Sequence, residues 1–252
     1  MIRLIGLTKR YGNFLAVDHL DLTVHPGEIF GFLGPNGAGK TTTVKMMAGL
    51  LKPSSGSILL AGFDLEKEPE TAKSLFGYIP DRPFLYEKLT AREYLTFTAA
   101  LYGTDGKQVR DKVEDLLELF ELKDWGDELV EGFSHGMRQR LVTSGALIHR
   151  PQILIVDEPM VGLDPKGVRL VKGIFRQLSD QGVSLFMCTH SLEIAEELCH
   201  RVAILQEGRI LAQGSIRELR DLSQTEEGKL EEIFLKLTGA EDLQIAIKAL
   251  RA

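Results

Sequence analysis

A glycine-rich loop at residues 34–41, GPNGAGKT, constrains the fold of this chain more than any other segment. It fits the phosphate-loop pattern G-x-x-x-x-G-K-[ST] and lies between a short apolar stretch, EIFGFL, and a segment with helical character, KTTTVKMMAGLL. Its glycines allow backbone N–H groups to converge on phosphate oxygens, and the helix N-terminus adds positive potential. The loop therefore predicts a strand–loop–helix unit in which Lys40 reaches the β and γ phosphates and Thr41 holds Mg²⁺.

Two adjacent carboxylates follow a second apolar strand. The segment ILIVDEP places Asp157 and Glu158 at the strand's carboxyl end, where open α/β sheets bind their ligands. Phosphoryl transfer needs an acidic residue near Mg²⁺ and another group that positions or activates the attacking water. Without a phosphate loop the pair would be interpreted as a solvated strand end. With it, Asp157 suits the first role and Glu158 the second.

Composition narrows the class of protein further. The chain has 252 residues, of which 44% are hydrophobic, so it can bury a full core as one domain or as one domain with a subdomain. Its net charge of -6 argues against nucleic acid as the main partner. Cys188 and Cys199 form no disulfide framework and no C-x-x-C metal spacing, which favours a reducing compartment. Since no apolar run approaches the length of a membrane span, we expect a soluble chain that reaches a membrane only through a partner.

Three regions differ in their patterns. The first third mixes antiparallel strands, predicted from FLAVDHLDLTV, GSILLAG and FGYIP, with the phosphate-loop unit. Residues from about 82 to 150 show helical periodicity, and Thr90 and Glu93 form a capping-box pattern there. From Pro151 onward apolar strands alternate with helices, which indicates a parallel sheet covered on both faces. The tail beyond about residue 223 is charged and predicted to be helical.

The segment FSHGMRQRL, residues 133–141, raises the question of a Ser-His hydrolytic pair. Adjacent residues point in different directions, and a nucleophile and its base are usually neighbours in space rather than in sequence. A Ser134–His135 hydrolase is therefore disfavoured. The simplest interpretation of MRQR is the solvated start of a helix.

Taken together, these segments resemble the nucleotide-binding domain of ABC transporters over about residues 1–220. Tyr11 in KRYGNFLAV matches the aromatic residue that stacks on adenine in that family, and Asp81 in YIPDRP lies at its Q-loop position. FSHGMRQR matches the signature segment and GLDP, residues 162–165, matches the D-loop. His190, which follows SLFMCT, matches the switch histidine.

The resemblance implies an α/β fold with a P-loop NTPase core, an antiparallel β subdomain and a helical subdomain. The ABC-type ATPase domain would span residues 1–222, with the helical subdomain at about 82–150, and residues 223–252 would form a short helical C-terminal extension. Catalytic roles fall to Glu158, His190 and Lys40, and Mg²⁺ contacts to Thr41, Asp81 and Asp157. The implied ATP-binding residues are Tyr11, Gly34, Pro35, Asn36, Gly37, Ala38, Gly39, Lys40, Thr41, Thr42, Ser134, His135, Gly136 and Asp164.

In the head-to-tail dimer of this family, the signature residues face the γ-phosphate held by the partner's phosphate loop. Ser134 and Gly136 are thus expected to act across a dimer rather than within their own fold, and Asp164 can also cap the helix after Pro165. Two residues depart from the family pattern. Asp81 stands where Gln is usual, and His135 replaces the second signature glycine, at a cost of about 1–2 kcal/mol if that backbone needs a positive φ.

The function implied by the resemblance is an ATP-hydrolysing subunit that dimerises around two ATP, as a homodimer or with a paired second ATPase subunit. It would act on a separate transmembrane permease, from the cytoplasmic side of the cell membrane. The region IPDRPFLYEKLTAREYL resembles the ABC-2 type exporters, and we expect Phe84, Leu85 and Tyr86 to be exposed and to line the groove for the permease. The alternative is a soluble ABC-type ATPase in DNA repair, chromosome organisation or translation. Such proteins usually carry a long coiled-coil insertion or two fused cassettes, and this sequence has neither.

Overall fold

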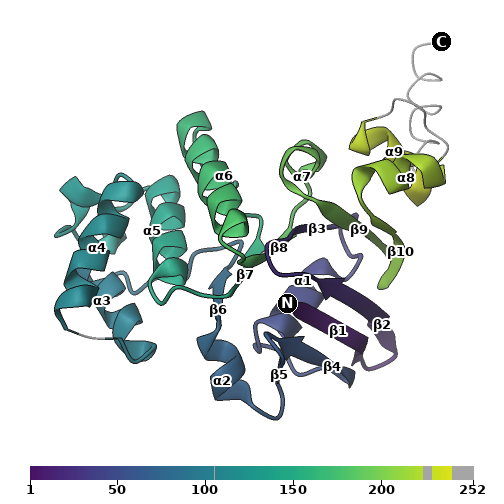
Figure 1. Cartoon of the computed structure of the whole chain (residues 1–252), viewed down its shortest axis with the longest axis horizontal. Helices are drawn as coiled ribbons and strands as arrows, with labels where there is room; N and C mark the ends of the chain where they lie inside the picture. Colours follow the sequence, from purple (N-terminus) through teal and green to yellow (C-terminus); the bar gives the residue numbers. More distant parts are fainter. Residues whose placement is uncertain (105, 224–228, 240–252) are drawn as a thin grey trace.

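A computed structural model describes residues 1–104, 106–223 and 229–239 and contains two β-sheets (Figure 1). The smaller sheet has the strand order β2-β1-β4-β5, and the larger has the order β10-β9-β3-β8-β7-β6. The strands are β1 Ile2–Tyr11, β2 Phe14–Val24, β3 Ile29–Leu33, β4 Ser55–Leu60, β5 Phe63–Asp64, β6 Phe76–Ile79, β7 Ile153–Asp157, β8 Ser184–Cys188, β9 Arg201–Gln206 and β10 Arg209–Gly214.

The helices lie around these sheets, and the sequence patterns predicted most of them. They are α1 Lys40–Met47, α2 Pro69–Ser74, α3 Ala91–Leu101, α4 Lys107–Leu119, α5 His135–Leu147, α6 Pro165–Asp180, α7 Leu192–Leu198, α8 Ile216–Ser223 and α9 Leu230–Thr238, with short 3-10 turns η1 Lys123–Trp125 and η2 Val130–Gly132. The predicted capping box is confirmed, since Thr90 Oγ1 accepts from the Glu93 N–H at 3.2 Å and Glu93 Oε2 accepts from the Thr90 N–H at 2.8 Å. Within the described residues, no helix is long and apolar enough to cross a bilayer.

The larger sheet is parallel except at one edge. Strands β9, β3, β8, β7 and β6 run parallel, but β10 pairs antiparallel with β9. The parallel sheet predicted after Pro151 is thus confirmed except for β10, and the prediction that grouped β6 with antiparallel strands was wrong, because β6 pairs with β7 across the intervening helices. Only Glu207 and Gly208 connect these two strands, and both have positive φ, 49° and 79°. A two-residue connection of this kind closes a hairpin and is too short for the crossover that parallel strands require.

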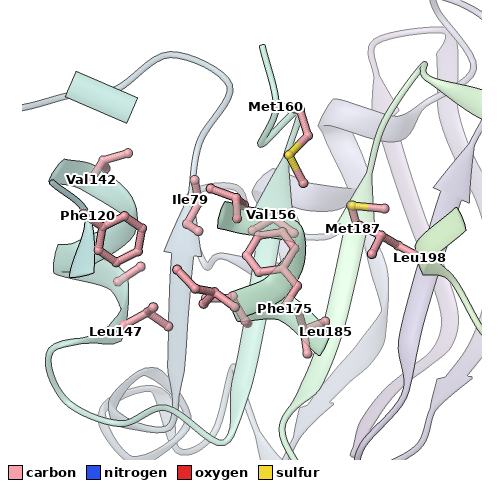
Figure 2. Packing of buried hydrophobic residues seen from close by; sticks show 14 of the residues in the cluster. Ile79, Phe120, Val142, Leu147, Val156, Met160, Phe175, Leu185, Met187 and Leu198 are labelled. Carbon is pink, nitrogen blue, oxygen red and sulfur yellow. The ribbon is translucent and has the colours of Figure 1, made fainter. Parts of the chain in front are cut away.

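Both faces of the larger sheet are buried, and alternate residues of each strand serve opposite faces. On β3, Phe30 and Phe32 pack towards α1 and the smaller sheet, whereas Ile29 and Leu33 belong to the other cluster, with α6 and α7. Figure 2 shows this second cluster, which continues from the sheet into the helices of residues 91–147. Its labelled members are Ile79, Phe120, Val142, Leu147, Val156, Met160, Phe175, Leu185, Met187 and Leu198.

The C-terminal helices are part of the folded body. Leu230 and Ile233 of α9 are fully buried in the cluster of α6 and α7, and the Gln206 side chain donates a hydrogen bond to the Thr238 carbonyl at 3.3 Å. The predicted boundary at residues 222/223 falls in the last turn of α8. Residues 224–228 and 240–252 of the predicted extension lie outside the described residues.

Candidate functional site

The loop at 34–41 is pressed against two other segments by close backbone contacts. Gly39 has φ 103°, and a Cβ there would lie 2.5 Å from the Ala16 carbonyl oxygen of β2. From the β9–β10 turn, the Gly208 N–H donates to the Ala38 carbonyl at 3.0 Å. Only glycine combines that backbone conformation with so close an approach. The fold therefore requires glycine at position 39 for packing as well as for access to a ligand.

The N-terminus of α1 is available to an anion. In many helices, a Ser or Asp side chain at the N-cap accepts a hydrogen bond from one of the first backbone N–H groups. Here the N-cap is Gly39, which has no side chain that could accept such a bond. The Lys40 ammonium lies within the same loop and donates to the carbonyls of Gly34 at 2.6 Å and Pro35 at 3.1 Å. Free N–H groups, a helix dipole and a cation converge on one place, which is the physical requirement of a phosphate site.

The carboxylates at the end of β7 lie across the pocket from this loop. In the parallel register, Asp157 pairs with Cys188 at the end of β8, and β8 in turn pairs with β3. Burial raises the pKa of the Asp157 carboxyl; the Cys188 thiol hydrogen bond opposes that shift, and the charges of Glu158 and Asp81 add to it. Glu158 and Asp81 are thus close enough to repel the charge of Asp157, and a bound cation would relieve this repulsion.

Glu158 is held by the segment that follows β8. It adopts a positive φ of 50°, which is uncommon for a residue other than glycine. Its Oε2 accepts from the Thr189 hydroxyl at 3.0 Å, and its Oε1 accepts from the His190 backbone N–H at 2.8 Å. The His190 Nδ1 also lies 2.8 Å from Oε1. Glu158 and His190 therefore form one hydrogen-bonded unit.

One pocket of about 550 Å³ collects most of the predicted catalytic and metal residues. It is large enough for a small-molecule ligand. Asn36, Lys40, Thr41, Asp81, Asp157, Glu158 and His190 line it, although they are dispersed over more than half of the chain. The lining also includes residues that the sequence motifs did not indicate: Lys45, Tyr78, Pro80, Arg82, Phe84, Val161 and Cys188.

The sequence contains features from which some of these additional residues could have been predicted. Lys45 follows Thr41 by four residues, so both lie on one face of α1. Cys188 ends the strand next to the one that carries Asp157. Tyr78 has no comparable signal; burial, with the nearby Asp157 charge, raises its pKa to about 12.

The signature residues do not line this pocket. Ser134 and His135 are exposed and Gly136 is partly exposed, and none of the three lines the pocket. Ser134 is the N-cap of α5, where its Oγ accepts from the Met137 N–H at 3.3 Å. Among the hydrogen bonds of the described residues, none joins the Ser134 hydroxyl to the His135 ring, in line with the argument against a Ser-His pair.

The His135 backbone is not strained. It is the first residue of α5 and lies outside the left-handed region, so the predicted cost of a positive φ does not arise. Its ring contacts Gly162, where a Cβ would be 2.0 Å from the ring Cδ2. Asp164 caps α6, as predicted, with its Oδ1 accepting from the Gly167 N–H at 2.9 Å.

Tyr11 and the segment after Asp81 are also on the surface. Tyr11 ends β1 with 48% of its surface exposed, and the Lys9 ammonium lies 5.3 Å from its ring centre. Phe84 and Tyr86 are 83% and 59% exposed. The prediction that Leu85 is exposed with them was wrong, because its side chain is partly buried against the core cluster of the helical segment.

Comparison with known proteins places the chain in a family. A profile described as "ABC transporter" matches residues 17–161. The chain belongs to the ABC transporter family. As an ABC-type ATPase it shares 40% identity over 225 residues with an uncharacterised ABC transporter ATP-binding protein of Bacillus subtilis, YxlF, covering 89% of this chain and 74% of that protein.

Two further comparisons agree with this assignment. The chain is 38% identical over 221 residues to Nod factor export ATP-binding protein I of Cupriavidus metallidurans, covering 88% of this chain and 73% of the relative. A solved structure, entitled "Structure of ATP binding subunit of ABC transporter", superimposes with a TM-score of 0.90 at 32% identity and covers 94% of this chain and 99% of its own.

The buried charge of Asp157 leads to a testable trade-off. The pKa of Asp157 is higher in the folded state than in the unfolded chain, so the folded state loses stability as the pH rises from the unfolded pKa through the folded pKa. The neutral Asp157→Asn variant should therefore be more stable at pH 7 without nucleotide. A gain of roughly 1 kcal/mol would raise the melting temperature by about 2–4 °C for a chain of this size. MgATP should stabilise the variant less than the unaltered chain. Asp111→Asn, on the exposed side of α4, is the control; equal melting temperatures for all three proteins would contradict this account.

Proposed function

We propose that the chain is the ATP-hydrolysing subunit of an ABC exporter whose membrane-spanning part is a separate polypeptide, and that it works as a dimer around two ATP molecules. One observation supports the proposal of a dimer. The residues that the motifs assign to ATP are divided between two surfaces, because the pocket of Lys40 and Glu158 does not include Ser134 or Gly136. A head-to-tail pair, in which a second copy or a paired second ATPase subunit faces each pocket, would bring the two surfaces together.

Within one chain, the loop residues Gly34 to Thr42 would cradle the phosphates, and Tyr11 would stack on adenine. Lys40 would leave the loop carbonyls of Gly34 and Pro35 for the β and γ phosphates, a better charge match for an ammonium. Glu158 would orient or activate the attacking water, and His190, already bonded to Glu158, would contact the γ-phosphate.

The donor set of the pocket fits Mg²⁺. Among the described residues no three His, Cys, Asp or Glu side chains are arranged to hold a metal by themselves. Mg²⁺ in nucleotide sites is held by one or two carboxylates together with phosphate oxygens and water, so Thr41, Asp157 and Asp81 suffice. When bound, the ion neutralises charge on the phosphates. Asp81 is shorter than the usual Gln at its position, and its contact would be direct or through water.

From the other surface, the N-terminus of α5 would meet the second molecule's γ-phosphate. Ser134, Gly136 and the first N–H groups of α5 form a neutral anion-binding surface, which stabilises charge without introducing a competing ion pair. Asp164 would lie at the same dimer interface. Half of each ATP site would therefore come from a different molecule.

The segment from Asp81 to Lys88 connects the pocket to α5 and carries the exposed aromatic residues. Asp81 and Phe84 line the pocket, whereas Glu87 accepts from the Arg138 guanidinium of α5 at 2.6 Å. Tyr86 packs edge-on against Phe97, with ring centres 5.3 Å apart. An exposed aromatic surface of this kind is typical of protein interfaces, and we assign it to the permease. The similarity to a Nod factor export protein supports export as the direction.

Trapping the ATP-bound state tests the function as a whole. Glu158→Gln should bind MgATP without turnover, because the amide cannot accept a proton from water, and it should dimerise. Recovered from membranes of the source cell with MgATP, the variant should bring a membrane-spanning protein with it, identified by mass spectrometry. Glu158→Gln with Ser134→Glu is the control and should remain monomeric. If nucleic acid stimulated ATP turnover by the unaltered chain and no membrane protein were recovered with the variant, the soluble ATPase class would be favoured instead.

The docking surface has its own test. Changing Phe84 and Tyr86 together to Ala should reduce co-purification with the permease by at least about tenfold, since large aromatic residues dominate interface energies. Tyr86→Ala alone, at a residue outside the pocket, should also reduce recovery of the permease and should leave ATP binding unchanged. Leu50→Ala, at a residue 67% exposed that does not line the pocket, is the matched control. Unchanged recovery of the permease would remove this assignment.

A further inference from the structure

The ring of His135 occupies a place that any side chain on Gly162 would need. A Cβ built on Gly162 would lie 2.0 Å from the His135 Cδ2 and 2.6 Å from its Nε2, far inside contact distance. Gly136 approaches the same residue, because a Cβ there would be 3.2 Å from the Gly162 carbonyl oxygen. The start of α5 is therefore packed directly onto the segment 161–164 of its own chain.

A second contact joins the same two segments one helical turn further along. Arg140 follows Gly136 by four residues, so both face the same way on α5. Its guanidinium lies 3.6 Å from Asp164 Oδ1 and 3.4 Å from Glu121 Oε2, and Lys166 pairs with Glu121 as well. The side chain of Arg140 is only 17% exposed, which favours a fixed geometry. His135 and Arg140 thus hold the segment at two points.

That segment begins at the catalytic pocket. The Val161 N–H donates to the Glu158 carbonyl at 3.2 Å, and the Leu163 N–H donates to the Met160 carbonyl at 3.3 Å, so a short turn leads from Glu158 to Gly162. At the other end, His135 lies between the two signature residues proposed to meet the second molecule's nucleotide. A displacement at Ser134 or Gly136 therefore reaches Glu158 through few bonds.

We propose that His135 is a positioning residue that couples the signature segment to Glu158 within one chain, through its contact with Gly162. When α5 meets the nucleotide of a second molecule, the His135–Gly162 contact moves segment 161–164 with it and sets the Glu158–His190 unit for turnover. This inference rests on the proposed function, and it gives the histidine that replaces a glycine of the family pattern a role towards its own chain.

A double-mutant cycle tests the coupling: Gly162→Ala, His135→Gly and the two together. Gly162→Ala should displace the ring and lower kcat by at least about twentyfold, while the affinity of the monomer for ATP, measured with a fluorescent analogue, stays within about twofold. His135→Gly alone should lower kcat by roughly three- to tenfold. In the His135→Gly background, adding Gly162→Ala should cost only about fivefold, the effect of Ala at a positive φ. Gly182→Ala is the control, because Gly182 also has a positive φ but has open space around it. Its kcat and melting temperature give the effect of placing Ala at a positive φ elsewhere in the chain.

Losses in kcat that simply multiply would overturn the coupling, even with ATP turnover by the unaltered chain intact. Coupling seen in the melting temperature but not in kcat would assign the contact to stability alone and would overturn it too. Absence of ATP turnover by the unaltered chain would overturn the proposed function first, and this inference with it.

Discussion

The parallel pairing of β8 between β3 and β7 is the constraint on which the site depends. It places the carboxyl ends of three strands at one edge of the sheet, so that the loop after β3, the carboxylates after β7 and the Thr189–His190 segment after β8 share one pocket. The cost is visible in Asp157, whose pKa is raised by burial and by the charges of Glu158 and Asp81. A site that concentrates unfavourable charge in this way is stabilised by the ligand that neutralises it.

The same architecture supports the proposal that one chain makes only part of the site. The helical segment packs into the core cluster of the sheet, and α5 presents its N-terminus at the surface, where Ser134 and Gly136 do not line the chain's own pocket. Arg138 and Glu87 link α5 to the segment near Asp81, and Arg140 and His135 link it to the turn after Glu158. Events at the nucleotide, at the signature surface and at the exposed aromatic residues can therefore be mechanically connected.

Much of this could be predicted from the sequence, because glycine spacing, strand alternation and capping residues report local physics. The phosphate-loop unit, Asp164 as an N-cap and the Thr90–Glu93 box were predicted correctly. The antiparallel direction of β10 was not predicted, since an apolar strand pattern does not reveal direction; the two-residue Glu207-Gly208 connection is the feature that fixes it. Leu85 was misassigned because a run of apolar residues in a loop does not show which one turns inward. The contact of His135 with Gly162 joins two motifs that are distant in sequence, and no local pattern encodes it.

The central claim is that each ATP is enclosed by two molecules, and mixing two defective variants tests it most directly. Lys40→Ala impairs the pocket and Ser134→Glu the signature surface, so neither variant should hydrolyse ATP alone. In an equal mixture, a dimer that combines one of each variant contains one intact site. Turnover per subunit should therefore return to about a quarter of the unaltered rate if the variants pair at random, and to about half if only mixed dimers form. Full ATP turnover by Ser134→Glu alone would contradict the pairing of two copies around ATP. So would an absence of recovery on mixing, if both variants fold normally.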